Sequence, residues 1–313
     1  MTGGTLTVHD VVEAMEERLG LSWVAGRQGG GRTLTHQAHV QDSPALVGHL
    51  NVIHPNQIQV LGPDEVRYLW TLRQNSQRDI FEHLVSGTSA MLVVTDGLTA
   101  QPELQSLADE RAVPLLVSPL QSHEVINILH YFFSDRLAET TTLHGVFMEV
   151  LGIGVLLTGE SAVGKSELAL ELITRGHRLI ADDAPEFARI APDILRGTCP
   201  PVLENFLEVR GLGVLNIRAM FGDSAIKSSK YLRLIIDLKD QAERPASDLD
   251  RLHGDHATRT VLGLPVPVIT LPVASGRNLA VMVEVAVRNH LLRLRGYFAA
   301  DDLAARQRRQ MCA

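Results

Sequence analysis

Cysteine is scarce in this sequence, and its scarcity argues against a disulfide scaffold or a cysteine-based metal domain. The 313 residues contain two cysteines, Cys199 and Cys312, which lie far apart and fit neither arrangement. Long apolar runs are also absent, since Ala90–Val94 is far shorter than the roughly 20 residues that a membrane span needs. The first ten residues lack the basic and apolar regions of a secretory signal. We therefore expect reduced thiols, no membrane attachment and a cytoplasmic location.

An excess of positive charge is absent as well. The 29 lysines and arginines are outnumbered by 36 acidic residues, and the net charge of −7 argues against a general binder of nucleic acid or anionic membranes. What is present is a globular composition, with 45% hydrophobic and 21% charged residues. A chain of 313 residues with this composition suits two domains of ordinary size.

The amino-terminal half predicts an α/β domain with a mostly parallel sheet. A capping box at Thr7–Asp10 precedes apolar residues at helical spacing, and Gly20 ends that helix. Strands and helices then alternate, which is typical of a parallel sheet with covered faces. The expected strands are Ile58–Leu61, Ala90–Thr95 and Val113–Val117. The stretch Pro63–Leu84 is expected to be largely helical, and the expected helices after it are Pro102–Arg111 and His123–Leu137. This half contains no nucleotide-binding motif, and a regulatory role is one open interpretation. A polar stretch after the last helix predicts two domains, residues 1–134 and 135–313.

The second half contains a phosphate-binding loop and predicts a P-loop kinase domain. Two apolar runs split by Gly152 predict a β-hairpin, whose second strand leads into Gly159-Glu160-Ser161-Ala162-Val163-Gly164-Lys165-Ser166. This segment matches G-x-x-x-x-G-K-[ST], and helix formers follow it as far as Gly176. Glycines let backbone N–H groups close around phosphate oxygens, and the helix start adds partial positive charge. Lys165 would reach the β- and γ-phosphates and Ser166 would bind Mg²⁺, so we expect an ATP-dependent phosphotransferase.

Several candidate site residues surround this loop. Asp182 and Asp183 follow a predicted strand, Arg178–Ala181, and the carboxyl ends of parallel strands face ligands. One aspartate is placed to address a magnesium–water shell and the other the substrate, although a solvated turn is the alternative. His144, at the head of the hairpin, is either structural or catalytic. The segment Leu207–Ile217 adds Glu208 as a candidate metal ligand, Arg210 as a candidate phosphate clamp, and Gly211 and Gly213, which suggest a close backbone approach.

The ordered motifs from Leu143 to Gly296 resemble one family, the bifunctional HPr kinase/phosphorylases. The matching runs are Leu143-His144-Gly145, GVLLTGESAVGKSELALELITRGHRLIADD, the neighbourhood of Cys199-Pro200-Pro201, LEVRGLGVLNIR, Leu249-Asp250-Arg251-Leu252 and PVASGRN. The amino-terminal half resembles the family more weakly but in the same order. Several separated motifs in sequence are more specific than the loop alone.

The resemblance implies an enzyme that phosphorylates a serine of HPr, the phosphocarrier protein of the sugar phosphotransferase system, with ATP or pyrophosphate as donor. It also implies phosphorolysis, in which inorganic phosphate removes that phosphoryl group and pyrophosphate leaves, and hence a part in regulating carbon metabolism. A cytoplasmic homohexamer is implied too. By the resemblance, Asp183 is the general base, His144, Lys165 and Arg251 complete the catalytic centre, Ser166 and Glu208 bind Mg²⁺, and the supporting residues are Asp182, Arg210, Gly211, Gly213, Pro272 and Arg277.

Two positions depart from the family pattern. Ala162 stands where the family usually has glycine, and Ala184-Pro185 where Arg-Val is expected, but neither change removes a catalytic group. A kinase for a small metabolite and a non-catalytic nucleotide sensor are the other interpretations of the loop, whereas a GTPase is disfavoured because no Asn-Lys-x-Asp segment occurs. The arginine-rich tail from Arg288 to Arg309 predicts a solvated helix face or, by the resemblance, a docking surface for the carrier protein.

Overall fold

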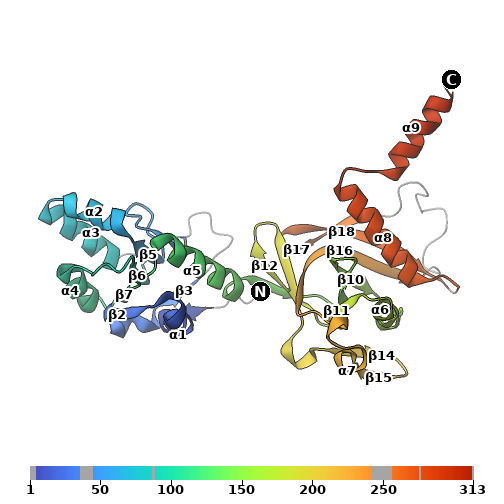
Figure 1. Ribbon diagram of the computed structural model, residues 1–313, viewed down its shortest axis with the longest axis horizontal. Coiled ribbons are helices and arrows are strands. Elements are labelled where there is room, and N and C mark those ends of the chain that lie inside the picture. The colour runs from blue at the N-terminus through green and yellow to red at the C-terminus, as the bar shows by residue number, and fades with distance from the viewer. Residues whose placement is uncertain (1–4, 36–44, 87–88, 241–255, 275, 312–313) are drawn as a thin grey trace. The chain divides into compact units, whose positions relative to one another are not determined.

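The computed structural model describes residues 5–35, 45–86, 89–240, 256–274 and 276–311. The chain forms two compact units, residues 1–139 and 140–313, which we describe separately (Figure 1). The division falls within a strand, β8 (Glu139–Thr142), a few residues after the boundary expected from the sequence. Among the described helices, none combines the length and the apolar character that crossing a membrane requires.

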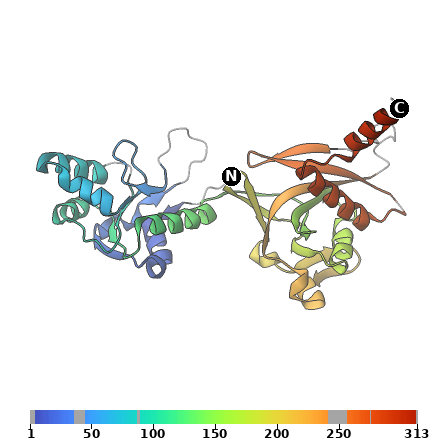
Figure 2. The ribbon, with the colours of Figure 1, turned by 45° about the horizontal axis from the view of Figure 1, so that its top comes forward.

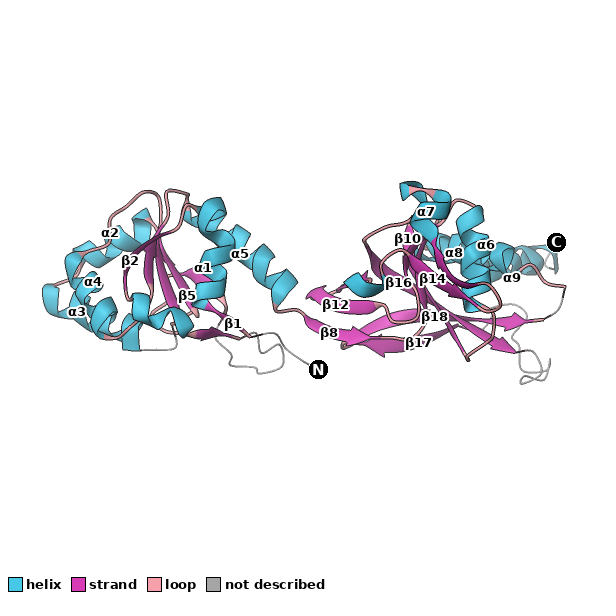
Figure 3. Cartoon of the chain, turned by 90° about the horizontal axis from the view of Figure 1, so that it is seen from below, coloured by secondary structure: helices cyan, strands magenta, loops and turns pink. Residues whose placement is uncertain are grey.

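The first unit is built on a five-stranded sheet with the order β2-β7-β6-β5-β4. Strands β4 to β7 pair in parallel and β2 pairs antiparallel with β7, so the expected mostly parallel sheet is confirmed. Helices α1 and α5 cover one face, and α2, α3 and α4 the other (Figure 3). The elements are β1 (Leu6–Thr7), α1 (Val8–Leu19), β2 (Ser22–Ala25), a 3₁₀ turn (Arg27–Gly31), β3 (Thr33–Leu34), β4 (Val47–His49), β5 (Ile58–Leu61), α2 (Pro63–Thr71), α3 (Gln74–Ser86), β6 (Met91–Val94), α4 (Pro102–Glu110), β7 (Leu115–Val117) and α5 (Ser122–Arg136).

The start of α1 and the division between α2 and α3 can be compared with the expectations from the sequence. The start of α1 was correctly expected, because Thr7 accepts a hydrogen bond from the Asp10 N–H and Gly20 ends the helix at φ 59°. The stretch Pro63–Leu84, expected to be largely helical, is confirmed as two helices, α2 and α3. They are separated at Leu72, which takes an extended conformation (φ −79°, ψ 151°) and whose side chain packs against the core beneath them.

The second unit contains a nine-stranded mixed sheet in which β10 lies near the centre. Its neighbours are β9, which is antiparallel, and β16, which is parallel and in turn pairs in parallel with β18. The elements after β8 are β9 (Val146–Val150), β10 (Ile153–Gly159), α6 (Lys165–Thr174), β11 (Arg178–Ala181), β12 (Glu186–Ala191), β13 (Ile194–Thr198), β14 (Phe206–Val209), β15 (Gly213–Asn216), α7 (Ile217–Phe221), β16 (Ser229–Asp240), β17 (His256–Val261), β18 (Leu264–Val273), α8 (Leu279–Leu294) and α9 (Ala299–Met311).

The arrangement of these elements gives the loop after β10 rigid supports. The expected hairpin is present as β9 and β10, joined at Leu151 and Gly152, which both have positive φ. Helices α6 and α8 lie side by side on one face of the sheet (Figure 2). Strands β14 and β15 form a separate two-stranded sheet.

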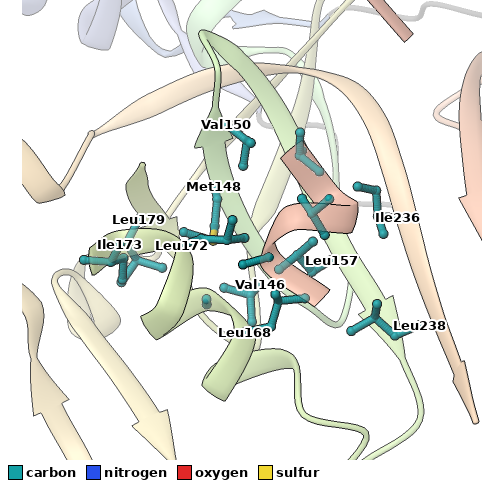
Figure 4. Close-up of a cluster of buried hydrophobic side chains, with 14 of the residues drawn as sticks. Val146, Met148, Val150, Leu157, Leu168, Leu172, Ile173, Leu179, Ile236 and Leu238 are labelled. Atoms are coloured by element: carbon teal, nitrogen blue, oxygen red, sulfur yellow. The ribbon is translucent and has the colours of Figure 1, made fainter. Parts of the chain in front are cut away.

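A buried apolar cluster fixes α6 against the sheet (Figure 4). Val146 and Met148 of β9 and Leu157 of β10 face Leu168 and Leu172 of α6, and each of these side chains is at most 3% exposed. Burying a side chain of this size contributes about 1.5–3 kcal/mol. Both ends of the loop between β10 and α6 are therefore held by the core, so the loop keeps a defined shape.

Candidate functional site

The loop between β10 and α6 uses backbone conformations that most side chains avoid. Gly159, Ala162 and Gly164 have φ values of 141°, 65° and 98°. A Cβ atom on Gly159 would lie 2.5 Å from the Leu238 carbonyl oxygen, so no side chain fits there. Gly164 is the N-cap of α6. The chain thus turns directly into the amino end of a helix, where unpaired N–H groups and the helix dipole attract anions.

Lys165 and Ser166 are the first two residues of α6 and both are half-buried. The Lys165 ammonium group donates hydrogen bonds to the carbonyl oxygens of Gly159 at 3.0 Å and Glu160 at 2.8 Å. These two bonds hold the positive charge over the loop, although a cation opposes the dipole at the start of a helix. Phosphate oxygens bound in the loop would meet this ammonium group directly.

The turn after β11 presents Asp183 to solvent beside His144. Asp183 has φ 63°, a conformation that aspartate tolerates better than most residues. Its carbonyl oxygen accepts a hydrogen bond from the Gly145 N–H at 3.2 Å, which ties this turn to the head of β9. His144 Nδ1 lies 3.9 Å from Asp183 Oδ1, and the two side chains are 90% and 86% exposed. The structure therefore brings the expected base and the expected histidine together in an open position.

Asp182 differs from Asp183 in its burial and in its hydrogen-bond partner. It is half-buried, and its Oδ2 accepts a hydrogen bond from the Glu208 backbone N–H at 2.8 Å. Burial raises the pKa of the Asp182 carboxyl, and hydrogen bonds from the backbone N–H groups of Glu208 and Asp183 oppose that rise. The side chains of the two aspartates therefore lie in different surroundings. That of Asp183 is exposed to solvent, whereas that of Asp182 contacts the backbone of strand β14.

The hairpin of β14 and β15 carries the remaining candidates of the second motif. Glu208 and Arg210 are exposed, whereas the alternate residues Leu207 and Val209 are buried in the core. Gly211 and Gly213 have φ values of 86° and 83°, and nothing lies within 4 Å of a Cβ atom built on either. No part of the described chain makes a close approach to these glycines, and the turn between the two strands uses their positive φ, so the expected close backbone approach stays a prediction.

Pro272 and Arg277 lie at and beyond the carboxyl end of β18. Because β18, β16 and β10 are parallel neighbours, this end is on the same edge of the sheet as the phosphate-binding loop. Arg277 is exposed, and its N–H donates to the Ala274 carbonyl oxygen at 3.3 Å. Arg251, the remaining expected cation, lies outside the described residues.

A cavity of about 620 Å³ adjoins the loop on the β16 side. Its walls include His144, the loop residues 159–163, the end of β16 and Arg259. Sequence reasoning missed Asp237 there, whose Oδ1 accepts a hydrogen bond from the Thr158 hydroxyl at 2.9 Å. The available signal was an apolar strand ending in an aspartate, LRLIID, which the structure places beside β10.

The oxygen groups expected to bind a metal, those of Ser166 and Glu208, would suit Mg²⁺ better than a metal enclosed by side chains. No group of three or more histidine, cysteine or acidic side chains that could hold a metal occurs among the described residues. Mg²⁺ is commonly bound through one or two protein oxygens, substrate phosphates and water. A serine hydroxyl at the start of α6 and the exposed carboxylate of Glu208 fit that pattern, with the phosphates supplying the other ligands.

Comparison with known proteins gives consistent matches along the chain. Residues 6–133 match the HPr serine kinase N terminus, and residues 135–307 match the HPr serine kinase C-terminal domain. The HPr kinase/phosphorylase of Stenotrophomonas maltophilia (strain K279a) is 50% identical over 303 residues, which cover 96% of each chain. The HPr kinase/phosphorylase of Xylella fastidiosa (strain M12) is 48% identical with the same coverage.

A solved structure, the Hpr(Ser) kinase/phosphatase from Coxiella burnetii, is 36% identical and matches with a TM-score of 0.48. The match covers 52% of this chain and 98% of that one. The two family matches together extend over nearly the whole sequence, and the curated relatives are similar over nearly their full length. The chain belongs to the HPr kinase/phosphorylase family.

Proposed function

We propose that the chain transfers a phosphoryl group from ATP, or from pyrophosphate, to a serine of the phosphocarrier protein HPr. The reverse-type reaction is phosphorolysis, in which inorganic phosphate takes the phosphoryl group from phosphoserine and forms pyrophosphate. The observation that carries the proposal is a glycine-rich loop at the amino end of α6 that shares a cavity with His144, whose Nδ1 lies 3.9 Å from Asp183 Oδ1 in an open position. The names of the relatives, HPr kinase/phosphorylase, support the choice of acceptor.

The exposure of the pair favours a protein acceptor over a small metabolite. With 90% and 86% of their side chains exposed, His144 and Asp183 cannot exclude water by themselves. A kinase needs to exclude water because water competes with the acceptor hydroxyl. A partner protein that covers this surface would exclude water while presenting its serine.

The residues of the site would divide the chemistry between them. Asp183 accepts the proton of the serine hydroxyl as the new phosphorus–oxygen bond forms and the bond to the leaving phosphate breaks. In phosphorolysis, phosphate attacks the phosphorus of phosphoserine, and protonated Asp183 returns the proton to the leaving serine oxygen. Lys165 neutralises phosphate charge, and His144 helps to orient Asp183. Ser166 and Glu208 would hold Mg²⁺, which would supply positive charge to the transferred phosphoryl group.

Other parts of the proposal rest on the family resemblance. Arg251, outside the described residues, would be a further active-site cation. Arg210, with the turn at Gly211 and Gly213, would serve both directions, and the segment from Pro272 to Arg277 would serve phosphorolysis. We extend the proposal to a cytoplasmic homohexamer with a regulatory amino-terminal unit.

A transfer assay tests the proposal directly. Incubation with HPr, ATP and Mg²⁺ should yield phosphoserine, detected by mass spectrometry, and addition of inorganic phosphate to that product should release pyrophosphate. Lys165→Ala should lower both rates by about a thousandfold, because it removes a charge on the transferred phosphates. Lys230→Ala, which removes a lysine from the opposite end of β16, should leave both rates near those of the unmodified protein.

Three outcomes would refute the proposal. In the first, the folded protein leaves HPr unmodified but transfers the phosphoryl group of ATP to a sugar acid or a nucleoside, which would indicate a metabolite kinase. The second is tight ATP binding without turnover and with no effect of Asp183→Asn, which would indicate a nucleotide sensor. The third is full activity of Lys165→Ala.

A further inference from the structure

The carboxylate of Asp182 joins two separate parts of the second unit. Its Oδ2 accepts the Glu208 N–H at 2.8 Å, across 26 residues of sequence. A hydrogen bond from a backbone N–H to a carboxylate is charge-assisted and is about twice as strong as one between neutral groups.

The position of the β14–β15 hairpin depends on such a tie. The hairpin is a two-stranded sheet outside the large sheet, so within the described part of the chain no ladder of backbone hydrogen bonds joins it to the large sheet. Leu207 and Val209 anchor one face in the core that includes α6. Apolar contacts of this kind are non-directional, so they set no direction for the exposed side chain of Glu208. A hydrogen bond at the Glu208 N–H fixes the backbone position of this exposed residue directly.

The backbone of Asp182 also sets the neighbouring turn. Its carbonyl oxygen accepts the Ala184 N–H at 2.8 Å, which closes a tight turn around Asp183. The Asp183 carbonyl oxygen is bonded in turn to Gly145, next to His144. Asp182 therefore contacts the strand that carries Glu208 through its side chain and the turn that carries Asp183 through its backbone.

We propose that Asp182 is a positioning residue that aims the Glu208 carboxylate at the metal ion accompanying the phosphates. Its side chain holds the β14 edge, and proton transfer is left to Asp183. This inference rests on the proposed function in one respect, the role of Glu208 as a metal ligand. It differs from the sequence-based expectation that one of the two aspartates faces the magnesium–water shell itself.

The test measures metal dependence separately from catalysis. Binding of a fluorescent ADP analogue to the full chain is titrated with Mg²⁺, and the Mg²⁺ and pH dependence of phosphoryl transfer are measured in parallel. Asp182→Ala should raise the half-saturating Mg²⁺ concentration by about tenfold or more, as is usual when a group that orients a metal ligand is removed. Asp182→Asn should stay within about threefold of the unmodified protein, because its amide oxygen accepts the same N–H bond. The pH profile of transfer should keep its shape in both variants.

Glu208→Gln separates failure of this inference from failure of the proposed function. If Glu208→Gln weakens Mg²⁺-dependent ADP binding and Asp182→Ala does not, the positioning role of Asp182 is wrong and the metal-ligand role of Glu208 stands. If neither changes it, the metal-ligand role itself is wrong. Asp182→Asn as defective as Asp182→Ala, or a changed pH profile in either variant, would also overturn the inference. The binding titration needs no HPr, so it remains informative if transfer to HPr is not observed.

Discussion

The ion cluster around Glu284 offers a quantitative test of how α8 is held against α6. Glu284 accepts two hydrogen bonds from Arg175, Nε to Oε1 at 3.0 Å and Nη2 to Oε2 at 2.6 Å. The Nε2 atom of His177, a residue that is 9% exposed at its side chain, lies 3.0 Å from Oε1. The Arg175 hydrogen bonds, followed by that of His177, lower the pKa of Glu284 from 4.5 to about 2, against the opposing effect of burial.

The pKa shift converts into an expected loss of stability for Glu284→Gln. A fall from 4.5 to about 2 corresponds to about 3 kcal/mol at about 1.4 kcal/mol per pKa unit. Arg175 keeps 35% of its side chain exposed, so solvent screening reduces the expected cost to about 1–2 kcal/mol. Because the folded pKa lies below the unfolded value, this stabilisation is complete above pH 4.5 and is lost as the pH falls towards about 2. At about pH 3 less than half should remain.

The assay is urea unfolding of the full chain, followed by far-ultraviolet circular dichroism at about pH 7 and about pH 3. Both tryptophans, Trp23 and Trp70, lie in the first unit, so their fluorescence should report an unchanged transition and serve as an internal control. Asp193→Asn, at an exposed turn of the second unit, is the matched control and should cost less than about 0.5 kcal/mol. The electrostatic account would be refuted if Glu284→Gln left the unfolding transition of the second unit unchanged at pH 7. An equal loss of unfolding free energy at pH 7 and pH 3 would refute it too.

Two further predictions concern single residues near the site. Ala162→Gly should raise the melting temperature of the second unit, measured by calorimetry. The substitution relieves about 1–2 kcal/mol of left-handed backbone strain at φ 65°, which exceeds the conformational-entropy cost of a glycine, about 0.5–1 kcal/mol. A lower melting temperature would contradict this. Burial raises the pKa of the Cys199 thiol to about 11, so in a Cys312→Ser background iodoacetamide should alkylate it about a hundredfold more slowly than an ordinary thiol. Mass spectrometry measures the rate of alkylation, and unfolding in urea should restore the rate of an ordinary thiol. Fast alkylation of the folded chain would contradict the effect of partial burial on this thiol.

Much of the fold could be expected because its signals are local. The hairpin of β9 and β10 ends at two positive-φ residues, and the capping box of α1 lies within four consecutive residues. The break between α2 and α3 could not be expected. Leu72 is neither glycine nor proline, and it leaves the helix because its side chain packs into the core below. Tertiary packing overrides helix propensity at such a position.

The parts of the site that sequence reasoning missed are contacts between distant segments. Asp237 meets Thr158 across 79 residues, because β16 rather than a strand closer in sequence pairs with β10. Asp182 meets Glu208 across 26 residues, at a strand edge whose place depends on packing. Residue type and spacing identify the loop at Gly159–Ser166, but they cannot say which strands will be neighbours. The sheet order has to be known first.

The sheet order also bears on how one site could serve two opposite reactions. The loop is fixed at both ends by buried contacts of β10 and α6, so a phosphate bound in it would keep a constant position. His144, Asp183 and Glu208 are exposed on turns and on the β14–β15 hairpin, where the proposed acceptor and phosphoserine would enter and leave. Catalysis of both directions requires that these groups meet the same geometry each time. The hydrogen bonds from the Glu208 N–H to the Asp182 carboxylate and from the Gly145 N–H to the Asp183 carbonyl oxygen would hold that geometry without enclosing the site. An acceptor carried on another protein would require such an open site.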